Sequence, residues 1–211
     1  MRVPIIGVTG PIASGKTTVA RFIAEGGGDL IDCDVLGGRA LQEEDVRRKL
    51  VAAFGIGVLG ASGAVSRRSL ARIVFASDRN LHRLNRIVRP HLKKIITDEV
   101  LKRRETARYI VLDAVLLFQY TFRFKIDYVV ATRASRARRL ARIMRRDGIS
   151  RAEALARIER QKKLADGWAR ADISITTDGA LARVRSDARR VRDRFLERVG
   201  ERWRKVRCKR S

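Results

Sequence analysis

Gly10-Pro11-Ile12-Ala13-Ser14-Gly15-Lys16-Thr17 decides the fold of this 211-residue chain, because it matches the pattern G-x-x-x-x-G-K-[ST] at every fixed position. Residues 3–9 before it are apolar enough for a buried parallel strand. Residues 17–25 after it have helical spacing and end at three glycines, a strong signal for the end of a helix. This order of strand, loop and helix predicts a phosphate-binding loop (P-loop).

The spacing of the loop also predicts its chemistry. Glycines at both ends let the backbone curl, so that successive N–H groups point into one hollow at a helix N-terminus. Lys16 would reach the β- and γ-phosphates of a nucleotide, and the Thr17 hydroxyl would bind Mg²⁺. We therefore expect a nucleoside triphosphate to bind here, with a chance match on a glycine-rich turn as the weaker alternative.

Composition indicates one globular domain, with 45% hydrophobic and 34% charged residues. Cys33 and Cys208 have no metal-ligand spacing, no apolar run approaches the roughly 20 residues of a membrane helix, and the N-terminus lacks signal-peptide features. We expect a cytoplasmic protein with no membrane partner.

The net charge of +25 has two explanations. Arginine supplies 38 of the 48 basic residues, and either a polyanionic partner or a general arginine bias on solvated faces would account for that. The arginines are spread over nearly every predicted helix, which favours the bias. A specific nucleic-acid partner is therefore not expected, and a basic nucleic-acid-binding module remains an alternative function.

Two acids end the second predicted strand, residues 29–34. In an extended segment Asp32 and Asp34 share a face, and at the carboxyl end of a parallel strand they would open into the ligand crevice. A carboxylate beside the γ-phosphate would accept a proton from an attacking hydroxyl. Aspartate also favours helix starts and turns, so a capping role stays equally open.

A largely helical stretch, from about residue 36 to 104, separates the second and third strands. We expect helices over residues 35–54, 65–75 and 78–102, with Pro90 kinking or restarting the last one. The stretch is much longer than an ordinary crossover, so it predicts a lobe over the sheet where the phosphate acceptor would bind.

The third strand, Tyr109–Asp113, is apolar and closes on an acid. Asp113 would hold Mg²⁺ directly or through water, although aspartates at strand ends are common without that role. We expect strands four and five over residues 126–131 and 171–176, and one long basic helix from residue 180 with a frayed tail over residues 202–210.

Seven arginines crowd the segment between the fourth strand and Arg146. Arg138, Arg142, Arg145 and Arg146 have helical spacing and share one face. Beside a phosphate loop, such a face predicts a lid whose guanidinium groups neutralise the transferring phosphoryl group. Without the loop it would read as an ordinary solvated helix. After the lid, Ser150 with Glu153 predicts a capping box.

Taken in order, these residues resemble the dephospho-CoA kinase family over about residues 3 to 180. The motifs that carry the resemblance are Gly7 to Thr18, Ile31-Asp32-Cys33-Asp34, Phe54-Gly55, Gly63 to Arg67, Ile73-Val74-Phe75, Leu84-Asn85, Arg89-Pro90, Val111 to Phe118, Arg142, Arg146-Asp147, Gln161 and Ala171 to Ile175. The resemblance implies ATP-dependent phosphorylation of the ribose 3′-hydroxyl of dephospho-CoA, with Mg²⁺ as cofactor.

The resemblance also implies a fold: a P-loop NTPase-type three-layer α/β sandwich with a five-stranded, mostly parallel sheet. Residues 1–211 would form a single kinase domain. Within it, residues 36–104 would be the acceptor-binding lobe, 133–150 the arginine-rich lid, and 180–211 the basic C-terminal helix and tail.

Site residues follow from the same resemblance, position by position. Asp34 falls on the catalytic base, and Arg67 and Arg89 fall in the acceptor lobe. Arg142 and Arg146 match lid arginines, the first predicted to be catalytic and the second to bind ATP. The predicted ATP site comprises Ala13, Ser14, Gly15, Lys16, Thr17 and Thr18, and the predicted Mg²⁺ ligands are Thr17 and Asp113.

The chain also departs from the family pattern. It has Arg89 before Pro90 where the family has histidine, Val115 and Gln119 in place of proline and glutamate, Thr176-Thr177-Asp178-Gly179 in place of Asp-Asn-x-Gly, and Gly38 in place of an arginine. These departures leave the loop and Asp34 intact and mostly concern the acceptor pocket. The alternative is therefore another P-loop nucleoside or nucleotide kinase with a different acceptor.

Overall fold

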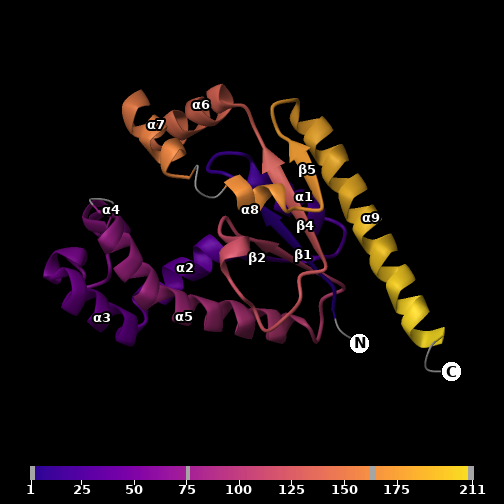
Figure 1. Cartoon of the computed structure of the whole chain (residues 1–211), viewed down its shortest axis with the longest axis horizontal. Coiled ribbons are helices and arrows are strands. Elements are labelled where there is room, and N and C mark those ends of the chain that lie inside the picture. The colour runs from indigo at the N-terminus through magenta and orange to yellow at the C-terminus, as the bar shows by residue number, and fades with distance from the viewer. Residues whose placement is uncertain (1–2, 75–76, 162–164, 209–211) are drawn as a thin grey trace. The chain divides into compact units, whose positions relative to one another are not determined.

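The computed structural model describes residues 3–74, 77–161 and 165–208 (Figure 1). Phe75, at the end of a predicted helix, and Lys209-Arg210 of the predicted tail lie outside the described residues. The chain divides into two compact units, one formed by Met1–Asp32 with Val100–Ser211 and the other by Cys33–Glu99. We call them the sheet unit and the helical unit.

The sheet unit is built on five strands, all parallel, in the order β2-β3-β1-β4-β5. They are β1 (Ile5–Thr9), β2 (Asp29–Asp32), β3 (Ile110–Asp113), β4 (Tyr128–Arg133) and β5 (Ile173–Thr176). β1 is central, and its Val8 lies opposite Asp113 of β3 and Val130 of β4. The loop after β1 therefore leaves from the middle of the carboxyl edge, which is where parallel α/β sheets bind ligands.

Helices follow the strands of this unit. They are α1 (Lys16–Ala24), η2 (Leu117–Gln119), α6 (Arg136–Asp147), α7 (Arg151–Arg160), α8 (Ala165–Ala169) and α9 (Leu181–Cys208). α1 and α9 pack on the same face, where Ile6, Val8, Ile23 and Phe195 are fully buried in one cluster (Figure 1). This face is a continuous apolar core, so its burial stabilises both helices and the sheet.

In its described residues, 33–74 and 77–99, the helical unit contains four helices and one short turn of 3₁₀ helix. They are α2 (Cys33–Gln42), α3 (Glu44–Phe54), η1 (Ile56–Val58), α4 (Arg67–Val74) and α5 (Asp78–Arg103), the last of which continues into the sheet unit. Val46, Leu50, Val58 and Val74 form its buried core. The unit thus has a core of its own.

The fold prediction is confirmed, and the sheet is fully parallel rather than mostly so. The capping box is also confirmed: the Ser150 hydroxyl accepts from the Glu153 N–H, and the Glu153 carboxylate accepts from the Ser150 N–H at 2.9 Å. Among the described residues, no helix is both long enough and apolar enough to span a bilayer.

Some element boundaries were predicted wrongly. The second strand ends at Asp32 and α2 begins at Cys33, so Asp32 and Asp34 do not share a strand face. Asp34 lies in the first helical turn, where a carboxylate is stabilised by the helix dipole. The single helix predicted over residues 35–54 is two helices, because the chain turns extended at Glu43.

Two helices continue further than predicted. α5 passes through Pro90 without restarting, since a proline removes one backbone hydrogen bond and the turns on either side still support the helix. α9 is helical to Cys208, so the predicted frayed tail is wrong over the described part of that segment.

Candidate active site

The loop between β1 and α1 has the curvature that the glycines predict. Gly10 and Gly15 have φ angles of 148° and 81°, and Ala13 adopts φ 59°, the left-handed region that side chains disfavour. Gly15 is the N-cap of α1, which begins at Lys16. Alternating left- and right-handed residues at a helix N-terminus make a concave set of N–H groups suited to phosphate.

Thr132, the fifth residue of β4, contacts the start of the loop. Its buried hydroxyl lies 2.6 Å from the Ser14 Oγ and donates to the Thr9 carbonyl at 3.2 Å. A Cβ on Gly10 would come within 2.7 Å of the Thr132 carbonyl oxygen. The glycine therefore lets the loop lie directly on β4.

Thr177, which follows β5, supports the end of the loop together with Arg142 of α6. The Thr177 hydroxyl donates to the Ser14 carbonyl at 2.8 Å. Arg142 donates through Nη1 to the Ala13 carbonyl at 3.0 Å and to the Thr177 Oγ1 at 2.9 Å, and through Nη2 to the Thr177 carbonyl at 2.6 Å. The predicted lid arginine is thus bound to the loop itself.

The middle of the loop is held at Ile12. Its N–H donates to the Gln161 Oε1 at 2.6 Å, and its carbonyl accepts from the Arg139 Nε at 2.9 Å. Burial lowers the pKa of Arg139 from its usual value, with a further contribution from the nearby Arg136 charge. Side chains from β4, α6, the end of α7 and the segment after β5 therefore fix successive residues of the loop.

Lys16, Thr17 and Asp113 form the polar centre at the carboxyl edge of β1 and β3. The Lys16 ammonium is paired with one oxygen of Asp113, and the Thr17 hydroxyl donates to the other at 2.8 Å. Burial raises the pKa of the Asp113 carboxyl, and the Lys16 charge with the hydrogen bonds from Lys16 and Thr17 opposes that rise. The side chain of Asp113 is completely buried.

A hydroxyl beside a carboxylate is a donor set that suits Mg²⁺, which prefers hard oxygen ligands and completes its shell with phosphate oxygens and water. Among the described residues, no group of three or more His, Cys, Asp or Glu side chains gathers where it would hold a metal by itself. The predicted pair of Thr17 and Asp113 fits the ion.

Arg146, the second predicted lid arginine, lies at the end of α6. Its Nε donates to the Asp147 Oδ1 at 2.7 Å, and Arg157 of α7 pairs with the other Asp147 oxygen. The hydrogen bond from Arg146, followed by the charges of both arginines, lowers the pKa of Asp147. The Arg146 side chain is exposed. Because its partner Asp147 also pairs with Arg157, Arg146 belongs to an ion-pair network between α6 and α7.

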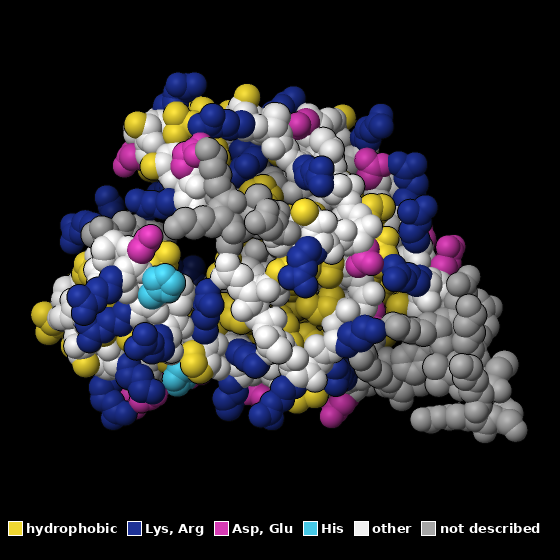
Figure 2. Space-filling view, viewed as in Figure 1, with side chains coloured by type: hydrophobic (Ala, Val, Ile, Leu, Met, Phe, Trp, Pro, Cys, Tyr) yellow, Lys and Arg dark blue, Asp and Glu magenta, His cyan; other side chains and the backbone are white. Residues whose placement is uncertain are grey.

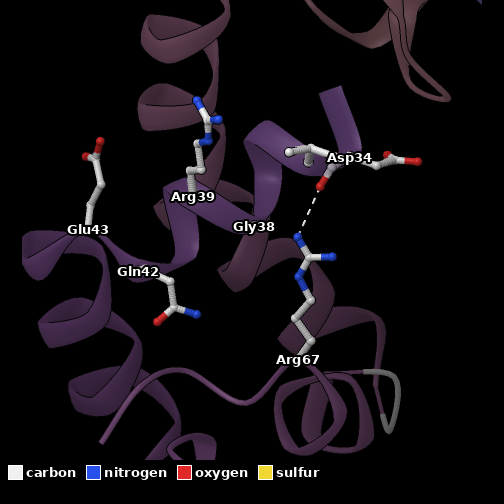
Figure 3. Close-up of a pocket in the computed structure, with 7 residues that line it drawn as sticks. Asp34, Gly38, Arg39, Gln42, Glu43 and Arg67 are labelled. Atoms are coloured by element: carbon white, nitrogen blue, oxygen red, sulfur yellow. Dashed lines mark hydrogen bonds between the residues drawn. The ribbon is translucent and has the colours of Figure 1, made fainter. Parts of the chain in front are cut away.

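The helical unit has its own cavity of about 750 Å³, lined in part by Asp34, Arg39 and Arg67 (Figure 3). The Arg67 Nη2 donates to the Asp34 backbone carbonyl at 3.1 Å, so the guanidinium closes on the first turn of α2. Gly38 permits this, because any Cβ there would collide with the Arg67 guanidinium. Arg89 is half-buried on α5 and does not line the cavity.

Sequence reasoning identified the loop and its acid partner but missed the two threonines that support them. Thr132 and Thr177 are buried polar residues at the carboxyl ends of apolar strands, and that position was the available signal. Thr177 was noted only as a departure from a family pattern. Its partners are 35 and 163 residues away, so its contacts exist only in the folded chain.

Comparisons with known proteins agree with this geometry. A family model described as dephospho-CoA kinase matches residues 4–183. The dephospho-CoA kinase of Bacillus licheniformis is 35% identical over 150 residues, which cover 69% of this chain and 74% of that protein.

Solved structures are similar as well. TT1252 from Thermus thermophilus is 31% identical with a TM-score of 0.74, covering 93% of this chain and 98% of the other. A dephospho-CoA kinase from Campylobacter jejuni is 22% identical with a TM-score of 0.58, covering 90% and 96%, and shows likeness of fold.

Proposed function

The chain belongs to the dephospho-CoA kinase family, and we propose on that basis that it transfers the γ-phosphoryl group of ATP to the ribose 3′-hydroxyl of dephospho-CoA. The products are coenzyme A and ADP, which makes this the last step of coenzyme A biosynthesis. The observation that carries the proposal is the complete phosphate loop with Lys16 and Thr17 at Asp113, within a family match over residues 4–183. We further propose a cytoplasmic location.

The loop residues Ala13 to Thr18 bind the ATP phosphates in this proposal. Lys16 exchanges its partner, the Asp113 carboxylate, for the β- and γ-phosphates. Because Asp113 is buried, an ammonium held beside it is already desolvated, and the exchange replaces one anion with another. Thr17 and Asp113 would hold Mg²⁺, and the bound ion would neutralise charge on the phosphate oxygens.

Asp34 acts as the base. Its carboxylate takes the proton of the 3′-hydroxyl as the new O–P bond forms, and the bond between the γ-phosphorus and the bridging oxygen breaks to release ADP. Asp34 lines the cavity of the helical unit with Arg67, and two guanidinium groups, those of Arg39 and Arg67, supply charge complementary to an acceptor that carries phosphates. Arg89 remains a proposed acceptor-binding residue, and Arg146 a proposed ATP-binding residue.

A coupled ADP-release assay with ATP, Mg²⁺ and dephospho-CoA tests the proposal. We expect Lys16→Ala and Asp34→Asn each to lower kcat at least 100-fold. The first removes the ammonium group that binds the phosphates, and the second removes the base. Asp98→Asn is the matched control: it makes the same change on the exposed side of α5 and should leave activity unchanged.

Each component of the proposal has its own contrary result. Full activity of Asp34→Asn would overturn Asp34 as base. The departures at Arg89, Val115 and Gln119 concern the acceptor, so a panel of nucleosides and nucleotides belongs in the same assay. ADP release with one of these compounds and none with dephospho-CoA would overturn dephospho-CoA as the acceptor. The assignment as a kinase would stand.

A further inference from the structure

We propose that Thr177 is a positioning residue for ATP: its hydroxyl holds the phosphate loop in its curved form and fixes the Arg142 guanidinium against it. The inference rests on the proposed function in that the nucleotide is ATP. It is carried by a chain of hydrogen bonds that converge on this one side chain.

The Thr177 hydroxyl both donates and accepts a hydrogen bond. A threonine hydroxyl has one hydrogen, which goes to the Ser14 carbonyl at 2.8 Å, and its oxygen accepts the Arg142 Nη1–H at 2.9 Å. The Thr177 carbonyl accepts the Arg142 Nη2–H at 2.6 Å, so the residue binds Arg142 twice. Arg142 in turn binds the Ala13 carbonyl.

These contacts determine the direction in which the Gly15 N–H of the loop points. In a planar trans peptide the carbonyl and the following N–H point in opposite directions. The Ser14 carbonyl is held on the Thr177 hydroxyl, so the Gly15 N–H points away from that hydroxyl. The Ala13 carbonyl, held by Arg142, fixes the preceding peptide, and Ala13 carries the disfavoured φ of 59°.

Thr177 is itself well anchored. Its N–H donates to the Arg133 carbonyl at 2.8 Å, which extends the pairing of β5 with β4 by one residue. The next residue, Asp178, accepts from the Ser135 N–H at the start of α6 with both carboxylate oxygens, at 2.9 and 3.0 Å. The hydroxyl is therefore presented to the loop from the rigid end of the sheet.

Burial makes the hydroxyl hard to replace. Thr177 is 4% exposed and Ser14 is fully buried, so water has little access to the groups that would lose their partners. Gly15 lets Thr177 approach, since a Cβ there would stand 3.1 Å from the Thr177 Oγ1. Valine would keep the shape of the side chain and remove both bonds of the hydroxyl.

Equilibrium binding of MgATP, measured by calorimetry without any acceptor, tests the inference. Variants of Thr177 separate the contribution of the hydroxyl to this affinity from that of the rest of the side chain. We expect Thr177→Val to weaken MgATP binding about 10-fold and to raise KM for ATP by a similar factor, with KM for dephospho-CoA unchanged. Thr177→Ser keeps the hydroxyl and should stay within about 3-fold of the wild type. Thr176→Val, the same change at the exposed neighbouring residue, is the matched control and should have no effect.

A purely structural role would lower thermal stability and active fraction without separating the two KM values. Wild-type MgATP affinity in Thr177→Val, or equal weakening in Thr177→Val and Thr177→Ser, would overturn the proposal. If valine prevents folding, Thr177→Ala takes its place with the same expectations. Because the binding test needs no acceptor, absence of dephospho-CoA phosphorylation by the wild type would overturn the proposed function and not this inference.

Discussion

At the scale of single residues, this protein depends on how closely its phosphate loop lies on the sheet. Gly10 and Gly15 each face a threonine, Thr132 and Thr177. The Thr132 hydroxyl bonds to the Thr9 carbonyl and the Ser14 hydroxyl, and the Thr177 hydroxyl donates to the Ser14 carbonyl. Buried hydroxyl-to-backbone bonds cost about 1–3 kcal/mol when one partner is lost, which is a large share of the stability of an average domain. The loop is therefore shaped by its supports as much as by its own glycines.

Gly10→Ala tests this directly. The new Cβ would stand 2.7 Å from the Thr132 carbonyl oxygen and 2.9 Å from the Ser14 Oγ, at a φ of +148°. We expect loss of MgATP binding by at least 10-fold and a fall in unfolding free energy of about 1–3 kcal/mol, measured by calorimetry and urea denaturation. Gly57→Ala is the control, because a Cβ added there would meet no atom within 4 Å. Equal behaviour of the two variants would contradict the claim that the loop lies too close to β4 for a side chain at residue 10.

At the scale of elements, α6 and α7 form a small layer next to the loop. Ile143, Ala154 and Ile158 bury their side chains between the two helices, and Ile12 and Ala13 of the loop pack against that cluster. The start of α7 is set by the capping box of Ser150 and Glu153. Its hydrogen bonds also lower the pKa of Glu153, so the carboxylate stays ionised where the helix dipole favours it.

Ser150→Ala removes that cap and should lower the unfolding free energy by about 1 kcal/mol. For a protein of this length the change corresponds to a fall in Tm of about 2–4 °C. Ser186→Ala, at an exposed position within α9, is the control and should cause no loss. An unchanged Tm in Ser150→Ala would show that packing alone determines where α7 begins.

At the scale of the whole molecule, the net charge is +25. On the face shown in Figure 2, Lys and Arg side chains are scattered among acidic and apolar ones and do not gather in one patch. Many arginines are committed to local ion pairs, such as Arg185 with Glu25 and Arg136 with Glu159. This distribution agrees with the arginine-bias explanation, and the absence of a specific nucleic-acid partner stays a prediction.

Ligand binding should stabilise the chain through the sheet unit. MgATP at about 100 times its Kd contributes about 2.7 kcal/mol to a state that binds it, which for this length is a Tm rise of about 5–10 °C. A thermal shift assay with and without MgATP checks the rise. Lys16→Ala should show a much smaller shift. A wild-type Tm that does not change when MgATP is added would contradict nucleotide binding at the loop.

Local patterns were sufficient for much of the fold. A strand, a glycine-rich loop and a helix with conventional signals at both ends can be recognised within about 20 residues, and the five strands and the capping box were predicted in the same way. The errors fell where neighbouring signals compete: aspartate at residue 34 suits a strand end or a helix start, and Pro90 permits either a break or a continuous helix.

The sequence by itself determined where the phosphate loop lies, because its glycines and their spacing allow the curved backbone that suits an anion. It also predicted Lys16 and Thr17 as the residues that would face the phosphates. Only the tertiary structure decided what holds that loop in place. Thr132, Arg142 and Thr177 come from distant parts of the chain, and their bonds to the loop depend on strand order and burial. Such contacts leave no periodic pattern in the sequence.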